Sequence, residues 1–89
     1  MLATIQKGSK DDVDLAIKSA REALDNGPWS RMDASERASM MIRFADLLEK
    51  NADELATLES LNNGKPAHIA KAGDLMLTHR CIRYYGGWV

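Results

Sequence analysis

The amino-acid sequence predicts an all-α chain of about four helices, preceded by a short strand remnant. Apolar residues recur at helical spacing through most of the chain, and helix-ending turns separate the periodic segments. The chain has 89 residues, and a chain of that size buries only about 60–65% of the surface that its unfolded form exposes. Residues 1–89 are therefore interpreted as one small helical segment with marginal stability.

Residues 2–6 read Leu-Ala-Thr-Ile-Gln, which alternate weakly and include β-branched types. This pattern predicts a short strand or its remnant. No second strand pattern follows, so the segment either frays or pairs with a strand outside this sequence.

The first helix is predicted to begin after Ser9, which forms a capping-box pattern with Asp12. The apolar face that follows contains Val13, Ala16, Ile17, Ala20, Ala23 and Leu24. Asn26-Gly27-Pro28 ends the helix, because proline cannot continue it. Trp29 lies in the linker, and we expect its ring to fill a gap between helices.

The second helix is predicted from Asp33 to Lys50, with Asn51 ending it and capping the third. A kink is therefore expected near Asn51. The third helix ends at Asn62-Asn63-Gly64. The apolar stripes of these two helices comprise Ala38, Met41, Ile42, Ala45, Leu48, Leu55, Leu58 and Leu61.

The fourth helix is predicted to begin at Pro66 and to continue to the end of the sequence. Its second half is apolar on several sides, which favours burial on both sides. Three short helices cannot cover both sides, and the sequence ends at Val89 without a capping residue, so we expect an incomplete domain. Close packing against another element would explain Gly73, Gly86 and Gly87 inside this helix.

Composition excludes several classes of function. Lys plus Arg number 12 and Asp plus Glu 13, so the net charge of −1 gives no basic surface for nucleic acid or anionic lipid. No apolar run approaches the roughly 20 residues of a membrane helix, and the N-terminus lacks the pattern of a secretion signal. The single cysteine excludes an internal disulfide and fits a reducing compartment.

No group of residues predicts an active site. Cys81 lies inside the fourth helix, where it is expected to be a small buried hydrophobic residue rather than a nucleophile. His68 and His79 lie about 16 Å apart on one helix, too far to share a metal ion. Gly64-Lys65 lacks the remaining residues of a phosphate loop, and Gly86-Gly87 does not follow a strand.

Several short motifs, in this order, resemble the NAD(P)-dependent aldehyde dehydrogenases. They are residues 12–24, Trp29-Ser-Arg-Met32, Ser35-Glu-Arg37, residues 44–49, Leu58-Glu-Ser-Leu-Asn-Asn-Gly-Lys-Pro66 and Ile82-Arg-Tyr-Tyr-Gly-Gly-Trp88. The resemblance covers nearly the whole chain, from about Ala3 to Val89. It implies a fragment of a larger α/β dinucleotide-binding domain, namely its N-terminal helical part.

The resemblance also implies what this segment contributes. The parent enzyme would oxidise an aldehyde to a carboxylic acid with NAD or NADP, as a homodimer or homotetramer, in the cytoplasm or the mitochondrial matrix. Catalytic and cofactor-binding residues would all lie downstream of residue 89. Gly73 and Leu77 would line the substrate tunnel, and Gly73 would widen its mouth. Asn62 stands where many relatives carry an Asp near a structural cation, but we expect no metal, because the upstream ligands are missing.

Two other interpretations remain open at this stage. Residues 66–89 could form the docking helix of a stand-alone interaction module, or Cys81 could serve a minimal thiol enzyme. The preferred interpretation is a scaffold segment and tunnel wall whose partner is the rest of an aldehyde dehydrogenase subunit.

Overall fold

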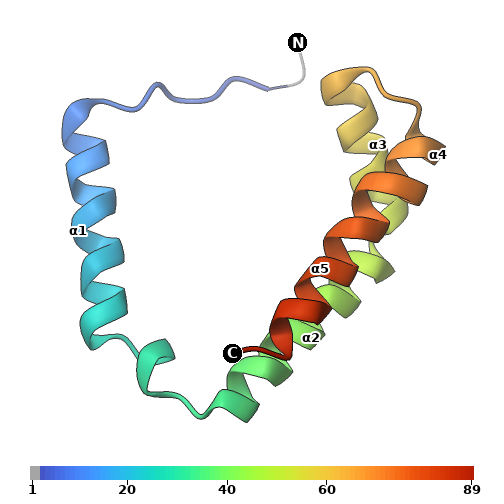
Figure 1. Ribbon diagram of the computed structural model, residues 1–89. Coiled ribbons are helices and arrows are strands. Elements are labelled where there is room, and N and C mark those ends of the chain that lie inside the picture. The colour runs from blue at the N-terminus through green and yellow to red at the C-terminus, as the bar shows by residue number, and fades with distance from the viewer. Residues whose placement is uncertain (1–2) are drawn as a thin grey trace. The chain divides into compact units, whose positions relative to one another are not determined.

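The computed structural model describes residues 3–89, and these residues form helices but no strand. The elements are α1 (Lys10–Asn26), η1 (Trp29–Arg31), α2 (Ala34–Lys50), α3 (Ala52–Asn63), α4 (Ala67–Ile69), η2 (Ala70–Leu75) and α5 (Met76–Gly86) (Figure 1). Because α4, η2 and α5 follow one another without a break, the main helices are four, as predicted. The chain divides into two compact units, Met1–Asp33 and Ala34–Val89.

The predicted strand remnant is not a strand in the part that can be described. Residues 3–9 adopt neither helix nor strand, and Leu2 lies outside the described residues. A strand is defined by its ladder of hydrogen bonds to a neighbour. No other strand is present among residues 3–89 to supply that ladder.

The first unit contains α1, and local signals set both of its ends. Ser9 and Asp12 form the predicted capping box: the Asp12 N–H donates to Ser9 Oγ at 3.2 Å, and the Ser9 N–H donates to Asp12 Oδ2 at 2.8 Å. At the other end the Gly27 N–H donates to the Ala23 carbonyl oxygen. No residue of α1 is buried, and Ile17 on its apolar face is 63% exposed.

The prediction that the Trp29 ring fills a gap between helices is wrong. Trp29 begins the short 3₁₀ helix η1 and is 43% exposed. An indole that filled a gap between helices would lose most of its contact with water.

The second unit begins with α2 and α3, which are separated at Asn51 as predicted. Asn51 leaves the helical conformation, with φ −101° and ψ 19°. Its side-chain amide donates to the Leu47 carbonyl oxygen at 2.7 Å, so it helps to end α2. The prediction that it also caps α3 is wrong for the side chain, which makes no hydrogen bond to that helix.

The core of the second unit is built from small residues where helices approach closely. In this unit α5 contacts α2, and η2 contacts α3 (Figure 1). Ala45, Ala56, Ala70 and Gly86 are the buried residues at these contacts. A Cβ added at Gly86 would lie 3.2 Å from Met41 Cβ, which confirms the predicted close packing at that glycine.

The other two helix-four glycines do not match that expectation. A Cβ at Gly73 would meet no heavy atom within 4 Å, and one at Gly87 would meet only the Tyr84 carbonyl oxygen of the same helix. Large apolar side chains on this unit are also exposed rather than packed: Phe44, Leu47, Leu58, Leu61, Leu77, Tyr84, Tyr85 and Trp88. Helix four therefore has the covered side that was expected, together with a second apolar side that the other helices of the second unit leave open.

One turn of helix four departs from the predicted α-helix. Residues Ala70–Leu75 form a π-helical segment between α4 and α5. Single π turns inside α-helices are rare and are frequent at functional sites. This π turn was not predicted, since Ala, Lys, Asp and Leu are all compatible with a regular helix and Gly73 alone does not mark a π turn.

Candidate functional site

The two residues expected to line a tunnel lie on one continuous helical rod. Gly73 is in the π-helical segment η2, and Leu77 follows at the second position of α5. Space is open around Gly73 within the chain, and Leu77 is 63% exposed. Leu77 thus presents an apolar side chain outward, one helical turn after Gly73, which has no side chain.

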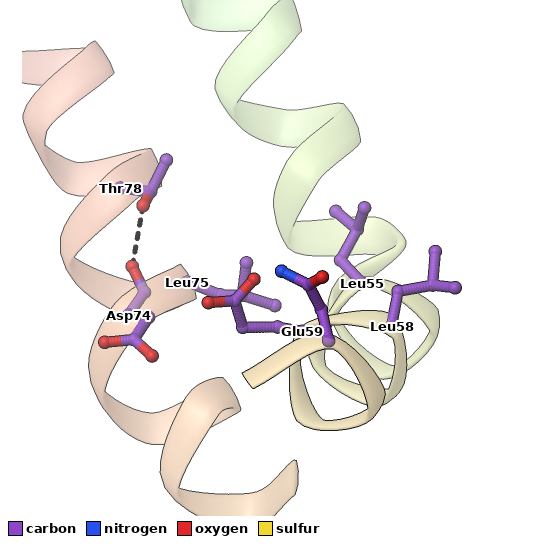
Figure 2. A pocket seen from close by; sticks show the side chains of 7 residues that line it. Leu55, Leu58, Glu59, Asp74, Leu75 and Thr78 are labelled. Atoms are coloured by element: carbon purple, nitrogen blue, oxygen red, sulfur yellow. Dashed lines mark hydrogen bonds between the residues drawn. The ribbon is translucent and has the colours of Figure 1, made fainter. Parts of the chain in front are cut away.

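A hollow of about 470 Å³ lies between α3 and the η2–α5 rod (Figure 2). Figure 2 shows Leu55 and Leu58 on the α3 side and Asp74 and Thr78 on the opposite rod. The full lining is Leu55, Leu58, Glu59, Asn62, Asp74, Leu75 and Thr78. It combines apolar residues with two carboxylates, but it contains no nucleophile paired with a base. The lining therefore fits a packing or positioning role better than a catalytic one.

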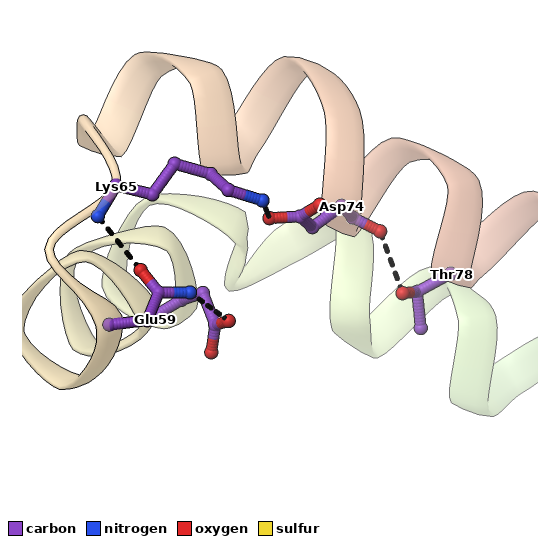
Figure 3. A network of polar contacts seen from close by, with 5 residues as sticks. Glu59, Lys65, Asp74 and Thr78 are labelled. Carbon is purple, nitrogen blue, oxygen red and sulfur yellow. Dashed lines mark hydrogen bonds and ion pairs between the residues drawn. The ribbon is translucent and has the colours of Figure 1, made fainter.

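A polar network joins the end of α3 to the π-helical segment (Figure 3). Lys65 Nζ lies 2.5 Å from Asp74 Oδ2, and the Thr78 hydroxyl donates to the Asp74 carbonyl oxygen at 2.7 Å. The Lys65 backbone N–H donates to Asn63 Oδ1 at 2.8 Å, and the Asn63 amide donates to Glu59 Oε1 at 2.6 Å. Sequence reasoning missed this network, because its main contact joins residues nine apart across a turn.

Gly64 supplies the sharp turn on which this network depends. It has φ +83°, the left-handed conformation that glycine adopts without strain, and its N–H donates to the Ser60 carbonyl oxygen. Gly64-Lys65 is therefore a helix end followed by an ion-paired lysine. This arrangement supports the prediction that the dipeptide is not a phosphate loop.

A second cluster ties α5 to α2. Arg83 Nη2 lies 2.6 Å from Asp46 Oδ1 and 2.8 Å from Glu49 Oε2, while Arg83 Nη1 lies 2.9 Å from His79 Nδ1. The hydrogen bond from Arg83, followed by its charge, lowers the pKa of the Glu49 carboxyl from its ordinary value of 4.5. The two carboxylates in turn raise the pKa of Arg83, which stays protonated. This cluster holds two helices together and contains no free acid–base pair.

The prediction that Cys81 is buried is wrong. Cys81 is exposed. His68 is exposed and His79 is half-buried against Arg83. Residues 3–89 contain no group of three or more His, Cys, Asp or Glu side chains that could hold a metal ion.

Within the described part of the chain, no helix has both the length and the apolar character needed to cross a membrane.

Comparison with known proteins identifies the family of this chain. The sequence profile of the aldehyde dehydrogenase family matches residues 1–89, the whole chain. The chain belongs to the aldehyde dehydrogenase family.

The relatives show how much of such a protein the chain represents. It is 49% identical over 87 residues to aldehyde dehydrogenase 1 of Tanacetum cinerariifolium, covering 98% of this chain and 17% of that protein. It is 47% identical over 89 residues to the mitochondrial aldehyde dehydrogenase of Homo sapiens, covering 99% of this chain and 17% of that protein. The chain thus spans about a sixth of the length of these relatives.

The solved structure of a relative contains the same fold as this chain. The aldehyde dehydrogenase of Bacillus cereus, in a structure described as an NAD+ complex, matches with a TM-score of 0.93 and 44% identity. The match covers 98% of this chain and 18% of that one. The all-helical fold is therefore that of a segment of a larger protein, as predicted. The comparisons give no support to the stand-alone interaction module.

Residues 3–89 do not by themselves fit a dinucleotide. The usual site needs a strand that leads through a glycine-rich turn into a helix N-terminus. Residues 3–89 contain no strand, Gly64 ends a helix, and the Lys65 amine is paired with Asp74.

Proposed function

We propose that residues 1–89 serve as a scaffold segment and one wall of the substrate tunnel in an aldehyde dehydrogenase subunit. The complete subunit oxidises an aldehyde to a carboxylic acid with NAD or NADP. This segment contributes no catalytic residue, no cofactor contact and no metal ligand. Its partner is the remainder of the subunit, and the subunits form a homodimer or homotetramer.

The observation that carries the proposal is the pairing of an open position at Gly73 with the exposed Leu77. A tunnel for aldehydes needs apolar walls, because the substrate chain is apolar and gains free energy when water leaves it. Leu77 supplies such a wall, and the missing side chain at Gly73 leaves room beside it. The family membership and the NAD+ complex of the Bacillus cereus relative support a different part of the proposal, the use of NAD by the complete subunit.

The exposed apolar residues of α5, together with Trp88 just after it, support the scaffold part of the proposal. Tyr84, Tyr85 and Trp88 are all more than half exposed, and the first two rings meet edge to edge with centroids 5.1 Å apart. A patch of this kind on a soluble protein marks a surface that another element covers. In the proposal that element belongs to the remainder of the same subunit.

The tunnel is tested by substrate preference in the complete subunit that contains residues 1–89. Gly73→Leu fills the open position, so kcat/KM for hexanal relative to acetaldehyde should fall about tenfold, the scale of a steric change in an apolar pocket. Leu77→Ala should shift the same ratio in the opposite direction. Leu61→Ala, which removes another exposed leucine, serves as the matched control and should leave the ratio unchanged.

The absence of catalysis is tested separately with residues 1–89 alone. Mixed with an aldehyde and either NAD+ or NADP+, this chain should produce no reduced cofactor. Reduction by the purified chain would refute the scaffold role, and unchanged hexanal-to-acetaldehyde ratios in both tunnel variants would refute the tunnel wall.

A further inference from the structure

The π-helical segment Ala70–Leu75 has an unusual place in the molecule. It interrupts an otherwise regular rod, and the residues that flank it, Ile69 and Met76, both have α-helical dihedral angles. A π turn spreads its hydrogen bonds over one more residue than an α turn does, so it changes the direction in which the following side chains point. Gly73 lies within this turn and Leu77 directly after it, so the turn sets how the two positions face outward.

Three contacts from outside the turn hold its shape. Ala70 is fully buried where the segment contacts α3. Lys65 reaches across from the connecting turn to Asp74, the residue next to Gly73, and Figure 3 shows this side chain lying along the rod. The Thr78 hydroxyl donates a hydrogen bond to the Asp74 carbonyl oxygen.

The backbone of Lys65 is itself held in place by a hydrogen bond. Its N–H donates to Asn63 Oδ1, directly after the left-handed Gly64 that ends α3. The ion pair therefore links a fixed point at the end of α3 to the middle of the π turn. An ion pair between side chains that are 38% and 42% exposed adds little to global stability. Its main effect is then geometric.

We propose that Lys65 and Asp74 are positioning residues that hold the π turn in place, and that they thereby set which aldehydes the tunnel accepts at Gly73 and Leu77. This inference rests on the proposed function, because it requires those two residues to face the substrate. Neither Lys65 nor Asp74 touches the reacting atoms in this scheme.

The experiment uses the complete subunit that contains residues 1–89, with the variants Lys65→Met and Asp74→Asn. Each removes the ion pair and keeps much of the side-chain shape. Both should change the ratio of kcat/KM for hexanal to that for acetaldehyde by about tenfold, since small displacements of positioned groups have effects of this size or larger. The change should appear in KM rather than in kcat. The charge-swapped double variant Lys65→Asp/Asp74→Lys should recover part of the original ratio.

Amide hydrogen exchange supplies a readout that is independent of substrate. Both single variants should exchange faster at residues 73–77 and keep the melting temperature of the parent subunit. Lys10→Met is the matched control, since it breaks a 2.6 Å ion pair with Asp14 on α1. It should change neither the exchange at residues 73–77 nor the substrate ratio.

The outcomes separate this inference from the proposed function. If Gly73→Leu and Leu77→Ala shift the substrate ratio while Lys65→Met and Asp74→Asn behave like Lys10→Met, the positioning role is overturned and the tunnel wall stands. If exchange at residues 73–77 rises but the substrate ratio stays within twofold, the pair orders the turn without setting specificity, and the inference is again overturned. If Gly73→Leu and Leu77→Ala leave the ratio unchanged, the proposed function fails first.

Discussion

The two units of this chain form helices equally well but bury very different amounts of them. In the first unit α1 has a complete capping box and a regular apolar face, yet none of its residues is buried. In the second unit α2, α3, η2 and α5 press small residues against one another and bury Ala45, Ala56 and Ala70. The difference teaches that local signals suffice to start and end a helix, whereas burial needs a partner surface at close range.

The same contrast appears within the second unit. Its buried residues are alanines and a glycine, which allow helix backbones to approach closely, while many of its large apolar residues remain exposed. Most helical stability in proteins comes from packing of an apolar face. The second unit has that packing along one side of helix four only.

The largest expected effect comes from filling the closest helix contact. Gly86→Leu places a side chain where Met41 Cβ lies 3.2 Å and Ile42 Cδ1 3.5 Å from the position of a new Cβ. Overpacking of this kind costs about 1–3 kcal/mol. Urea denaturation of residues 1–89, followed by circular dichroism at 222 nm, should show that loss of unfolding free energy.

Gly73→Ala is the matched control for this variant. Its new Cβ meets no heavy atom within 4 Å, and replacing glycine by alanine in a helix gains up to about 1 kcal/mol. Equal stabilities for the two variants would mean that α5 does not approach α2 at Gly86.

A middle-sized effect should appear in the first unit when its cap is removed. Ser9→Ala deletes the hydroxyl that accepts the Asp12 N–H, at a typical cost of about 1 kcal/mol. Amide hydrogen exchange should accelerate in residues 10–26 and stay unchanged in α5. Ser30→Ala, whose hydroxyl donates only to the Gly27 carbonyl oxygen, should leave exchange in α1 as it was.

The cap also gives α1 a pH dependence. The Ser9 backbone N–H, and then its hydroxyl, lower the pKa of Asp12 below its ordinary value of 3.8. Because the folded-state pKa is depressed, the stabilisation is fully present above pH 3.8 and is lost as pH falls through the folded-state pKa. A helix signal for α1 that grows on acidification would contradict the cap.

The smallest expected effect is on the ion pairs between α5 and α2. Arg83→Met removes contacts to Asp46 and Glu49 and should lower the stability of residues 1–89 slightly at pH 7, since exposed ion pairs contribute little. The pKa of Glu49 is depressed by Arg83, so this contribution is present above pH 4.5 and disappears as pH falls through the folded-state pKa.

Urea denaturation at pH 7 and pH 3 measures that change. The difference in unfolding free energy between the parent and Arg83→Met should be smaller at pH 3 than at pH 7. Arg21→Met, which removes a 3.6 Å ion pair within α1, should leave the second unit unaffected at both values. A larger difference in unfolding free energy at pH 3 than at pH 7 would show that Arg83 acts through something other than these carboxylates.

Sequence reasoning reached the helix ends with good accuracy and the burial pattern with less. The Ser9 cap, the stop at Gly27, the break at Asn51 and the left-handed end at Gly64 all follow from contacts within a few residues. Cys81 was misplaced because helical periodicity assigns a face without showing whether anything covers it. The Lys65–Asp74 contact and the π turn were not predictable, since both depend on how the rod lies against α3.

The candidate tunnel residues came from the resemblance alone. Nothing in the spacing of Gly73 and Leu77 marks them, and a glycine in a helix first suggested close packing. The structure shows open space at Gly73 and close packing at Gly86 instead. Two glycines in one helix therefore have opposite surroundings that the sequence does not distinguish.

By itself, the sequence determined the number of helices, their ends and the family of this chain, because capping, turn chemistry and residue order are local properties of the polypeptide. The tertiary structure alone decided which sides are buried, where backbones come close enough to require Ala45 and Gly86, and that one turn near Gly73 is π-helical. Those features depend on distances between residues far apart in the chain, and such distances are set only when the helices pack.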